Sequence, residues 1–99
     1  MSPSSPVTTT GVTLELVYLA RLRESFGRSA ESLTLAARDG AAVTVADVLA
    51  ALVARGGAYA RELAPGRVVR VAVNHDVVAD THPVRTGDEV ALLPPVTGG

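Results

Sequence analysis

The last six residues carry the clearest chemical signal in this sequence, and they read Pro94-Pro95-Val96-Thr97-Gly98-Gly99. Two prolines fix φ and favour an extended backbone, so the chain is expected to leave the body of the protein stiffly. Gly98 and Gly99 have no side chains, which lets the terminal carboxylate enter a channel too narrow for a Cβ atom. We therefore expect residues 94–99 to form an extended tail that reaches the reacting groups of another protein.

A free carboxylate is unreactive, so a partner must activate it. If a partner adenylates it with ATP, its carbonyl carbon becomes an electrophile, and attack by a sulfur nucleophile leaves a C-terminal thiocarboxylate. Such a sulfur carrier needs no cysteine, and the chain has none. A glycine pair at a terminus is also typical of a frayed end. The compact body, the last strand that leads into the tail and the proline pair favour the carrier.

All nine cationic side chains are arginines, so the chain has no lysine amine that would capture its own activated acyl group. A genome-wide codon bias accounts for the same composition and is the simpler explanation. The absence of lysine is therefore compatible with a carrier without identifying one.

Inside the predicted domain no set of residues forms an active-site pattern. His75 and His82 are seven residues apart in a turn and a loop, without acids at metal-ligand spacing, so we expect solvated histidines and no metal site. Ser25, Ser29 and Ser32 lack a Gly-x-Ser-x-Gly context, and no glycine-rich phosphate loop follows a strand. The chain is predicted to bind no cofactor and to have no catalytic activity on its own.

Length and composition predict one small globular domain. The 99 residues are 47% apolar and only 3% aromatic, so the core must be built from Val, Leu and Ala. A net charge of −1, with arginines scattered among ten acids, gives no basic stripe for nucleic acid. The N-terminus lacks the basic and apolar regions of a signal peptide, and the apolar runs are too short to span a membrane. We expect a cytoplasmic protein.

Hydrophobic periodicity predicts an α+β layer pair. Residues 12–19 alternate as an interior strand whose second face turns apolar at Val17 and Leu19. Thr44 and Asp47 have capping-box spacing before a helical stripe of Val and Leu, which predicts the one long helix. The other expected elements are helical turns over 21–26 ended by Gly27, a helical turn over 58–63, and strands over 32–35, 69–73, 77–78 and 89–93.

Three domain regions follow from these patterns. Residues 1–11 are assigned to a flexible N-terminal tail, because Ser, Thr and Pro cannot bury enough surface to be ordered. Residues 12–93 form the domain, and residues 94–99 form the C-terminal tail.

The segments Leu16–Glu24, Thr44–Leu49, Val71–Asn74 and above all Gly87–Gly99, which reads GDEVALLPPVTGG, resemble those of a known family. This family is the small subunit of molybdopterin synthase, a ubiquitin-like sulfur carrier of β-grasp fold. The resemblance covers about residues 12–99. It implies a mixed sheet with one main helix packed on one face.

The resemblance also implies a cycle of activation and sulfur transfer. An adenylyltransferase related to ubiquitin-activating enzymes uses ATP to form an acyl-adenylate on Gly99, and sulfur transfer gives the thiocarboxylate. The tail then enters the large subunit of molybdopterin synthase, which holds the catalytic side chains and uses the sulfur on cyclic pyranopterin monophosphate. In this cycle Gly98 provides clearance, while Pro94, Pro95, Val96 and Thr97 provide reach and docking contacts. The implied assembly is a heterotetramer of two small and two large subunits.

Because two partners must bind in turn, we expect an apolar docking patch on the exposed sheet face near the tail, with arginines at its rim. Each candidate side chain also suits a buried core position. The candidates are Val17, Leu19, Ala72, Leu92 and Leu93.

Three alternatives remain. A sulfur carrier for thiamine or cysteine biosynthesis shares the fold, the Gly-Gly end and the activation chemistry, although the Leu-Arg-Glu segment and the Pro-Pro-Val-Thr tail argue against it. A ubiquitin-like protein modifier, conjugated to lysines of targets, uses the same tail. A plain interaction module with an inert tail predicts no loss of function on deletion of Gly99.

Overall fold

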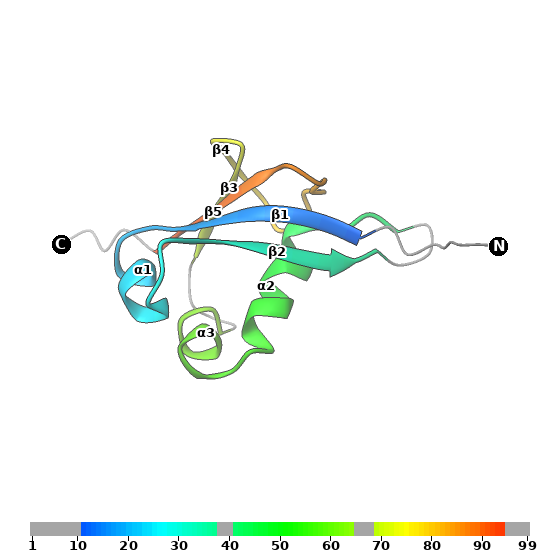
Figure 1. Cartoon of the computed structure of the whole chain (residues 1–99). Coiled ribbons are helices and arrows are strands. Elements are labelled where there is room, and N and C mark those ends of the chain that lie inside the picture. Colours follow the sequence, from blue (N-terminus) through cyan, green and yellow to red (C-terminus); the bar gives the residue numbers. More distant parts are fainter. Residues whose placement is uncertain (1–10, 38–40, 65–68, 95–99) are drawn as a thin grey trace.

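The computed structural model describes residues 11–37, 41–64 and 69–94 (Figure 1). All elements expected from the sequence are present, with ends that differ by no more than one or two residues. They are β1 (Gly11–Tyr18), α1 (Arg21–Phe26), β2 (Ala30–Ala36), α2 (Val45–Val53), α3 (Gly57–Glu62), β3 (Arg70–Val73), β4 (Asp76–Val78) and β5 (Glu89–Leu93).

The strands form one five-stranded mixed sheet in the order β2-β1-β5-β3-β4. β1 runs antiparallel to β2 and parallel to β5, and β3 runs antiparallel to both β4 and β5. A parallel pair needs a long crossover connection, and here the chain between β1 and β5 supplies it with three helices and the other strands. The last strand of the sequence therefore lies in the middle of the sheet, and β1 is interior as predicted.

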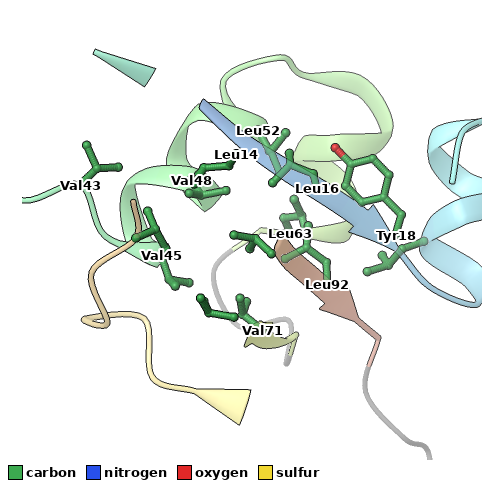
Figure 2. Packing of buried hydrophobic residues seen from close by; sticks show 14 residues of the cluster. Leu14, Leu16, Tyr18, Val43, Val45, Val48, Leu52, Leu63, Val71 and Leu92 are labelled. Carbon is green, nitrogen blue, oxygen red and sulfur yellow. The ribbon is translucent and has the colours of Figure 1, made fainter. Parts of the chain in front are cut away.

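The helices lie on one side of the sheet and leave the other side uncovered (Figure 1). Alternate residues of β1, namely Leu14, Leu16 and Tyr18, point to the helix side and are at most 1% exposed. They meet Leu52 of α2 and Leu92 of β5 in a single cluster (Figure 2). Full burial of each such leucine stabilises the fold by about 1.5–3 kcal/mol. The core thus consists of one sheet face and one helix stripe, as the Val- and Leu-rich composition predicts.

The start of α2 is fixed by the capping box that the sequence predicts. The Thr44 hydroxyl accepts a hydrogen bond from the Asp47 backbone N–H at 3.4 Å, and the Asp47 carboxylate accepts one from the Thr44 N–H at 2.9 Å. The box thus gives the Thr44 amide an acceptor and the Asp47 amide a second one, in addition to the Thr44 carbonyl at 3.0 Å. Val45, Val48 and Leu52 then follow at helical spacing and are buried. α2 is the one helix that packs a continuous stripe on the sheet.

The short helix α1 ends where the sequence predicts. Gly27 adopts a left-handed conformation with φ of 74°, and its N–H donates to the Arg23 carbonyl at 3.0 Å. Glycine suits this position because it has no Cβ to clash with the backbone. α1 turns the chain under the sheet and allows β2 to return beside β1.

The two tyrosines and the single phenylalanine of the chain gather under the same end of the sheet. The Tyr18 hydroxyl donates to the Glu31 carboxylate at 2.5 Å, and Arg55 binds both oxygens of that carboxylate at 2.8 and 3.0 Å. Phe26 and Tyr59 stack with ring centroids 4.3 Å apart. This aromatic cluster joins β1 and β2 to α1, α3 and the end of α2.

Candidate functional site

The tail begins from a strand that is held on both sides. Leu92 of β5 pairs with Tyr18 of β1 and with Val71 of β3, and its carbonyl accepts a hydrogen bond from the Leu19 N–H at 3.2 Å. Pro94 follows the strand and is half-buried. The remaining predicted tail residues, Pro95, Val96, Thr97, Gly98 and Gly99, lie outside the described residues. The base of the tail is therefore fixed by the centre of the sheet.

β1 and β5 run parallel and terminate at the same edge of the sheet, beside the first residue of β3, because Leu93 pairs with Arg70. We call this edge the exit end. The opposite edge, where β5 begins and β3 ends, is the far end. α1 follows β1 directly and contacts α3, so both short helices also lie at the exit end (Figure 1). The exit end is the part of the molecule that surrounds the base of the tail.

A row of apolar side chains crosses the uncovered face of the sheet near the exit end. The pairing register places one residue of each strand in this row, in the order of the strands. Its side chains alternate with those that enter the core, so they point away from the helices. This outer row consists of Ala30, Val17, Ala91, Ala72 and Val77.

Polar side chains occupy the same face towards the far end. The Ser32 hydroxyl donates to the Glu15 carboxylate at 2.9 Å, in the position next to the outer row. The Asn74 side chain accepts from the Glu89 N–H at 3.0 Å and donates to the Asp88 carboxylate at 2.9 Å. The outer row is therefore the apolar part of the uncovered face nearest the base of the tail, and hydrogen-bonded polar groups lie next to it.

The structure separates the five predicted docking residues. Val17 and Ala72 belong to the outer row, although Ala72 is only 8% exposed. Leu19 follows β1 and is 39% exposed, and Leu93 is half-buried beside Arg70. The prediction for Leu92 is wrong. Strand alternation turns its side chain to the helix side, where it is fully buried (Figure 2).

Three members of the outer row were not predicted from the sequence. Val77 is 63% exposed, and Ala30 and Ala91 flank Val17 on the neighbouring strands. Only the register brings these residues together, since they are distant in the sequence. No local sequence signal gave their alignment across strands.

Two arginines lie at the exit end near the predicted docking residues Leu93 and Leu19. Arg70 lies opposite Leu93, and Arg21 begins α1 just after Leu19. The Arg21 guanidinium is paired at 3.1 Å with Glu62, whose side chain is only 7% exposed and also accepts from the Ser25 hydroxyl. This pair fixes α1 against α3.

The remaining polar groups form no set with evident chemistry. His75 has a side chain that is 87% exposed, and its Nε2 lies 3.5 Å from Glu89. Within residues 11–37, 41–64 and 69–94, no three His, Cys, Asp or Glu residues gather in a way that would hold a metal ion. No helix in these ranges is long and apolar enough to cross a membrane.

A mixed five-stranded sheet with helices on one face and the last strand in the middle is the β-grasp arrangement expected from the sequence, the fold of the ubiquitin-like sulfur carriers. The chain belongs to the ThiS family, whose sequence profile matches residues 16–99. The molybdopterin synthase sulfur carrier subunit of Escherichia coli (strain K12) is 36% identical over 86 residues, which cover 87% of this chain and 99% of the relative. The family resemblance drawn from the sequence is thereby confirmed.

Solved structures show the same fold. SAMP1 from Haloferax volcanii, a small archaeal modifier protein, superposes with a TM-score of 0.66 at 29% identity, covering 88% of this chain and 99% of that chain. A chain from the complex of subunits 1 and 2 of molybdopterin-converting factor from Helicobacter pylori 26695 superposes with a TM-score of 0.54 at 24% identity, covering 88% and 99%. At 24% identity, the similarity to the Helicobacter pylori chain shows a shared fold and nothing further.

Proposed function

We propose that this protein is the sulfur-carrier subunit of a molybdopterin synthase. The observation that carries the proposal is its 36% identity, over almost the whole of both chains, to a relative that bears this name. The geometry agrees with the role, because the tail begins from the middle strand and beside an uncovered apolar row.

In the proposed cycle the terminal carboxylate of Gly99 attacks the α-phosphorus of ATP, which is bound by an activating adenylyltransferase. Pyrophosphate leaves, and a mixed acyl-phosphate anhydride forms. A hydrosulfide-type nucleophile then attacks the acyl carbon, so that a C–S bond forms, the C–O bond to phosphate breaks and AMP leaves. The carrier binds no cofactor itself and supplies no catalytic side chain. Its contribution is to present one carboxylate at the end of a narrow tail.

The thiocarboxylate is next delivered to the large subunit of the synthase, where the sulfur is transferred to cyclic pyranopterin monophosphate. We expect the large subunit to cover the outer row in the complex, because a group of exposed apolar side chains is typical of a surface that binds another protein. We propose an assembly of two small and two large subunits that works in the cytoplasm, where ATP is available for activation.

The first test is the intact mass of the protein after incubation with host lysate, ATP and a sulfur source. The proposal expects a gain that corresponds to one oxygen replaced by sulfur, and no gain when Gly98 and Gly99 are deleted. If the mass is unchanged although the activating enzyme is shown to be present and active, the carrier proposal is wrong and the chain is a plain interaction module.

A second test addresses the outer row through two exposed alanines of the same strand. Ala30 lies in the row, whereas Ala36 lies on the same face at the far end. Ala30→Asp is expected to weaken binding to the large subunit at least about tenfold, because the complex would bury an unpaired carboxylate. Val77→Asp is expected to act in the same way. Equal binding by Ala30→Asp and Ala36→Asp would exclude the row as the interface.

The likeness to SAMP1 supports a second candidate function, the covalent modification of other proteins. A modifier transfers the activated acyl group to target lysines, with loss of AMP and formation of an isopeptide bond. Incubation of labelled protein with lysate and ATP then gives a ladder of conjugates of higher mass. A carrier gives the thiocarboxylate without a ladder.

Membership of the ThiS family also leaves open a carrier for another sulfur pathway, such as thiamine or cysteine biosynthesis. The thiocarboxylated protein, mixed with a molybdopterin synthase large subunit and cyclic pyranopterin monophosphate, decides between these pathways. Sulfur transfer to the pterin supports the proposed function. Retention of the sulfur on the carrier, with a synthase that is active with its own carrier, supports another pathway.

A further inference from the structure

The ionisable side chains are divided between the two ends of the molecule. The exit end holds more arginines than carboxylates, on α1, on α3 and at the strand ends beside them. Among the described residues its carboxylates are Glu24, Glu31, Glu62 and Asp80, which follows the end of β4. Its arginines are Arg21, Arg23, Arg28, Arg55, Arg61 and Arg70.

The far end has the opposite balance. Among the described residues its arginine is Arg85, which lies in the loop that leads to β5. Its acids lie at the start of α2, at the start of β4 and at or just before the start of β5, together with one residue of β1. These acids are Glu15, Asp47, Asp76, Asp88 and Glu89.

Ion pairs neutralise only part of the positive exit end. Glu62 pairs with Arg21, and Glu31 is shared by Arg28 at 3.3 Å and Arg55 at 2.8 Å. Arg23, Arg61 and Arg70 are exposed and form no ion pair with another residue of the described ranges. We call these three the arginine collar, because they lie at the end from which the tail leaves.

We propose that the arginine collar guides the exit end onto an acidic protein surface around the active-site entrance of the partner that activates the C-terminal carboxylate. This inference rests on the proposed function, and it specifies that the surface of the activating partner that contacts the carrier is acidic. The collar suits carboxylates in particular, since a guanidinium binds a carboxylate through two parallel hydrogen bonds.

We assign the acidic surface to the activating partner and not to the large subunit, because the two proteins bind the carrier for different lengths of time. The carrier is a substrate of the activating partner, which it must find and leave in every cycle, whereas it is a subunit of the synthase. Charge complementarity acts mainly on the rate of encounter, and it orients a molecule whose two ends differ in sign. The acidic far end would be repelled by the same surface, so the molecule arrives with its tail first.

The experiment compares single charge reversals at matched positions in the full chain. Arg23→Glu and Arg61→Glu change exposed helical residues at the exit end, away from the outer row, and Arg85→Glu makes the same change at the far end. Pyrophosphate release by the host's activating enzyme gives kcat/KM for each protein at about 0.01 M and 0.1 M salt, where the screening length is about 30 and 10 Å. Thermal midpoints show whether each variant is folded, and Arg23→Gln and Arg61→Gln provide neutral versions.

We expect kcat/KM of Arg23→Glu and Arg61→Glu to fall about five- to tenfold at the lower salt concentration, with kcat unchanged and a smaller loss at the higher one. Arg85→Glu is expected to keep or exceed the kcat/KM of the unmodified protein. Equal losses in all three reversals, or losses that salt does not change, would overturn the collar while leaving the carrier function intact. Absence of pyrophosphate release with the unmodified chain would remove both proposals.

Discussion

Ala20 shows how a single residue shapes the exit end. Its backbone has φ of 52° and ψ of −129°, a region that residues with a Cβ rarely occupy. This conformation turns the chain from Leu19, which bonds to Leu92, into α1. Strain of this kind costs about 1–3 kcal/mol and persists only where the surrounding structure fixes it. Here the strand pairing on one side and α1 on the other fix it.

Replacement of Ala20 by glycine is therefore expected to raise the free energy of unfolding by about 0.5–1 kcal/mol, because relief of strain exceeds the added freedom of the unfolded chain. Ala54→Gly is the matched control, since Ala54 has ordinary helical angles at the end of α2. The control should lose about 0.5–1 kcal/mol. Urea denaturation measures both. A loss in both variants would show that Ala20 is not strained.

Glu31 is the residue on which the aromatic cluster depends. The hydrogen bonds from Arg55, supported by the one from the Tyr18 hydroxyl, hold the pKa of this carboxyl below its ordinary value of 4.5. Burial and the bond to Glu31 in turn raise the pKa of Tyr18. The charged form of Glu31 therefore stabilises the folded state. This contribution is fully present above about pH 4.5 and is lost as pH falls through the lower pKa of the folded state.

Glu31→Gln is expected to lower the free energy of unfolding by about 1–3 kcal/mol at pH 7, because Arg55 loses the charged acceptor of its two bonds. Near pH 3 the difference between the two proteins should shrink. The pKa of Asp88 is also held low, chiefly by the hydrogen bond from Asn74, but this group is present in both proteins. Denaturation at several pH values is the measurement. A difference that is constant with pH would contradict this account.

At the scale of elements, the stability of α2 depends on its first turn as well as on its buried stripe. Thr44→Ala removes the hydroxyl that accepts from the Asp47 N–H, so the free energy of unfolding should fall by about 1 kcal/mol. Thr44→Ser retains an acceptor and should lose much less. Chemical denaturation of the three proteins provides the comparison, and equal losses in both variants would assign the effect to the lost methyl group instead.

At the scale of the whole molecule, the elements that build the core and the C-terminal end that is proposed to carry sulfur are separate parts of the chain. The strands and helices that build the core end at Leu93, before the Gly-Gly end. A protein that lacks Gly98 and Gly99 should keep its thermal midpoint and its outer row, and still occupy the large subunit. We expect it to inhibit molybdopterin synthesis when added to a reconstituted system, in competition with the full chain.

The same truncation combined with Val77→Asp is the control for this inhibition, because it alters the outer row at an exposed position. The combined variant should inhibit only at concentrations about tenfold higher or more. Titration of synthase activity measures both proteins. If the truncated protein does not inhibit, then the tail rather than the sheet face supplies the binding energy.

Local patterns in the sequence determined every element and its type. Thr44 and Asp47 predict the start of α2, Gly27 predicts the end of α1, and alternation predicts the strands. The C-terminal sequence predicts the chemistry of the tail, and the resemblance to the family rests on the same residues. These features depend on interactions within a few residues, so the order of the amino acids specifies them.

Only the tertiary structure decided which side chains share a surface. Leu92 and Leu93 are adjacent residues of the same type. The alternation of side chains along β5 nevertheless buries Leu92 in the core and leaves Leu93 on the other face, beside Arg70. Ala30 and Val77 join one row because the register of four strand pairs aligns them. The arginine collar, too, comes from separate elements. Register and packing depend on contacts between distant segments, and no local pattern encodes which distant residues will be neighbours.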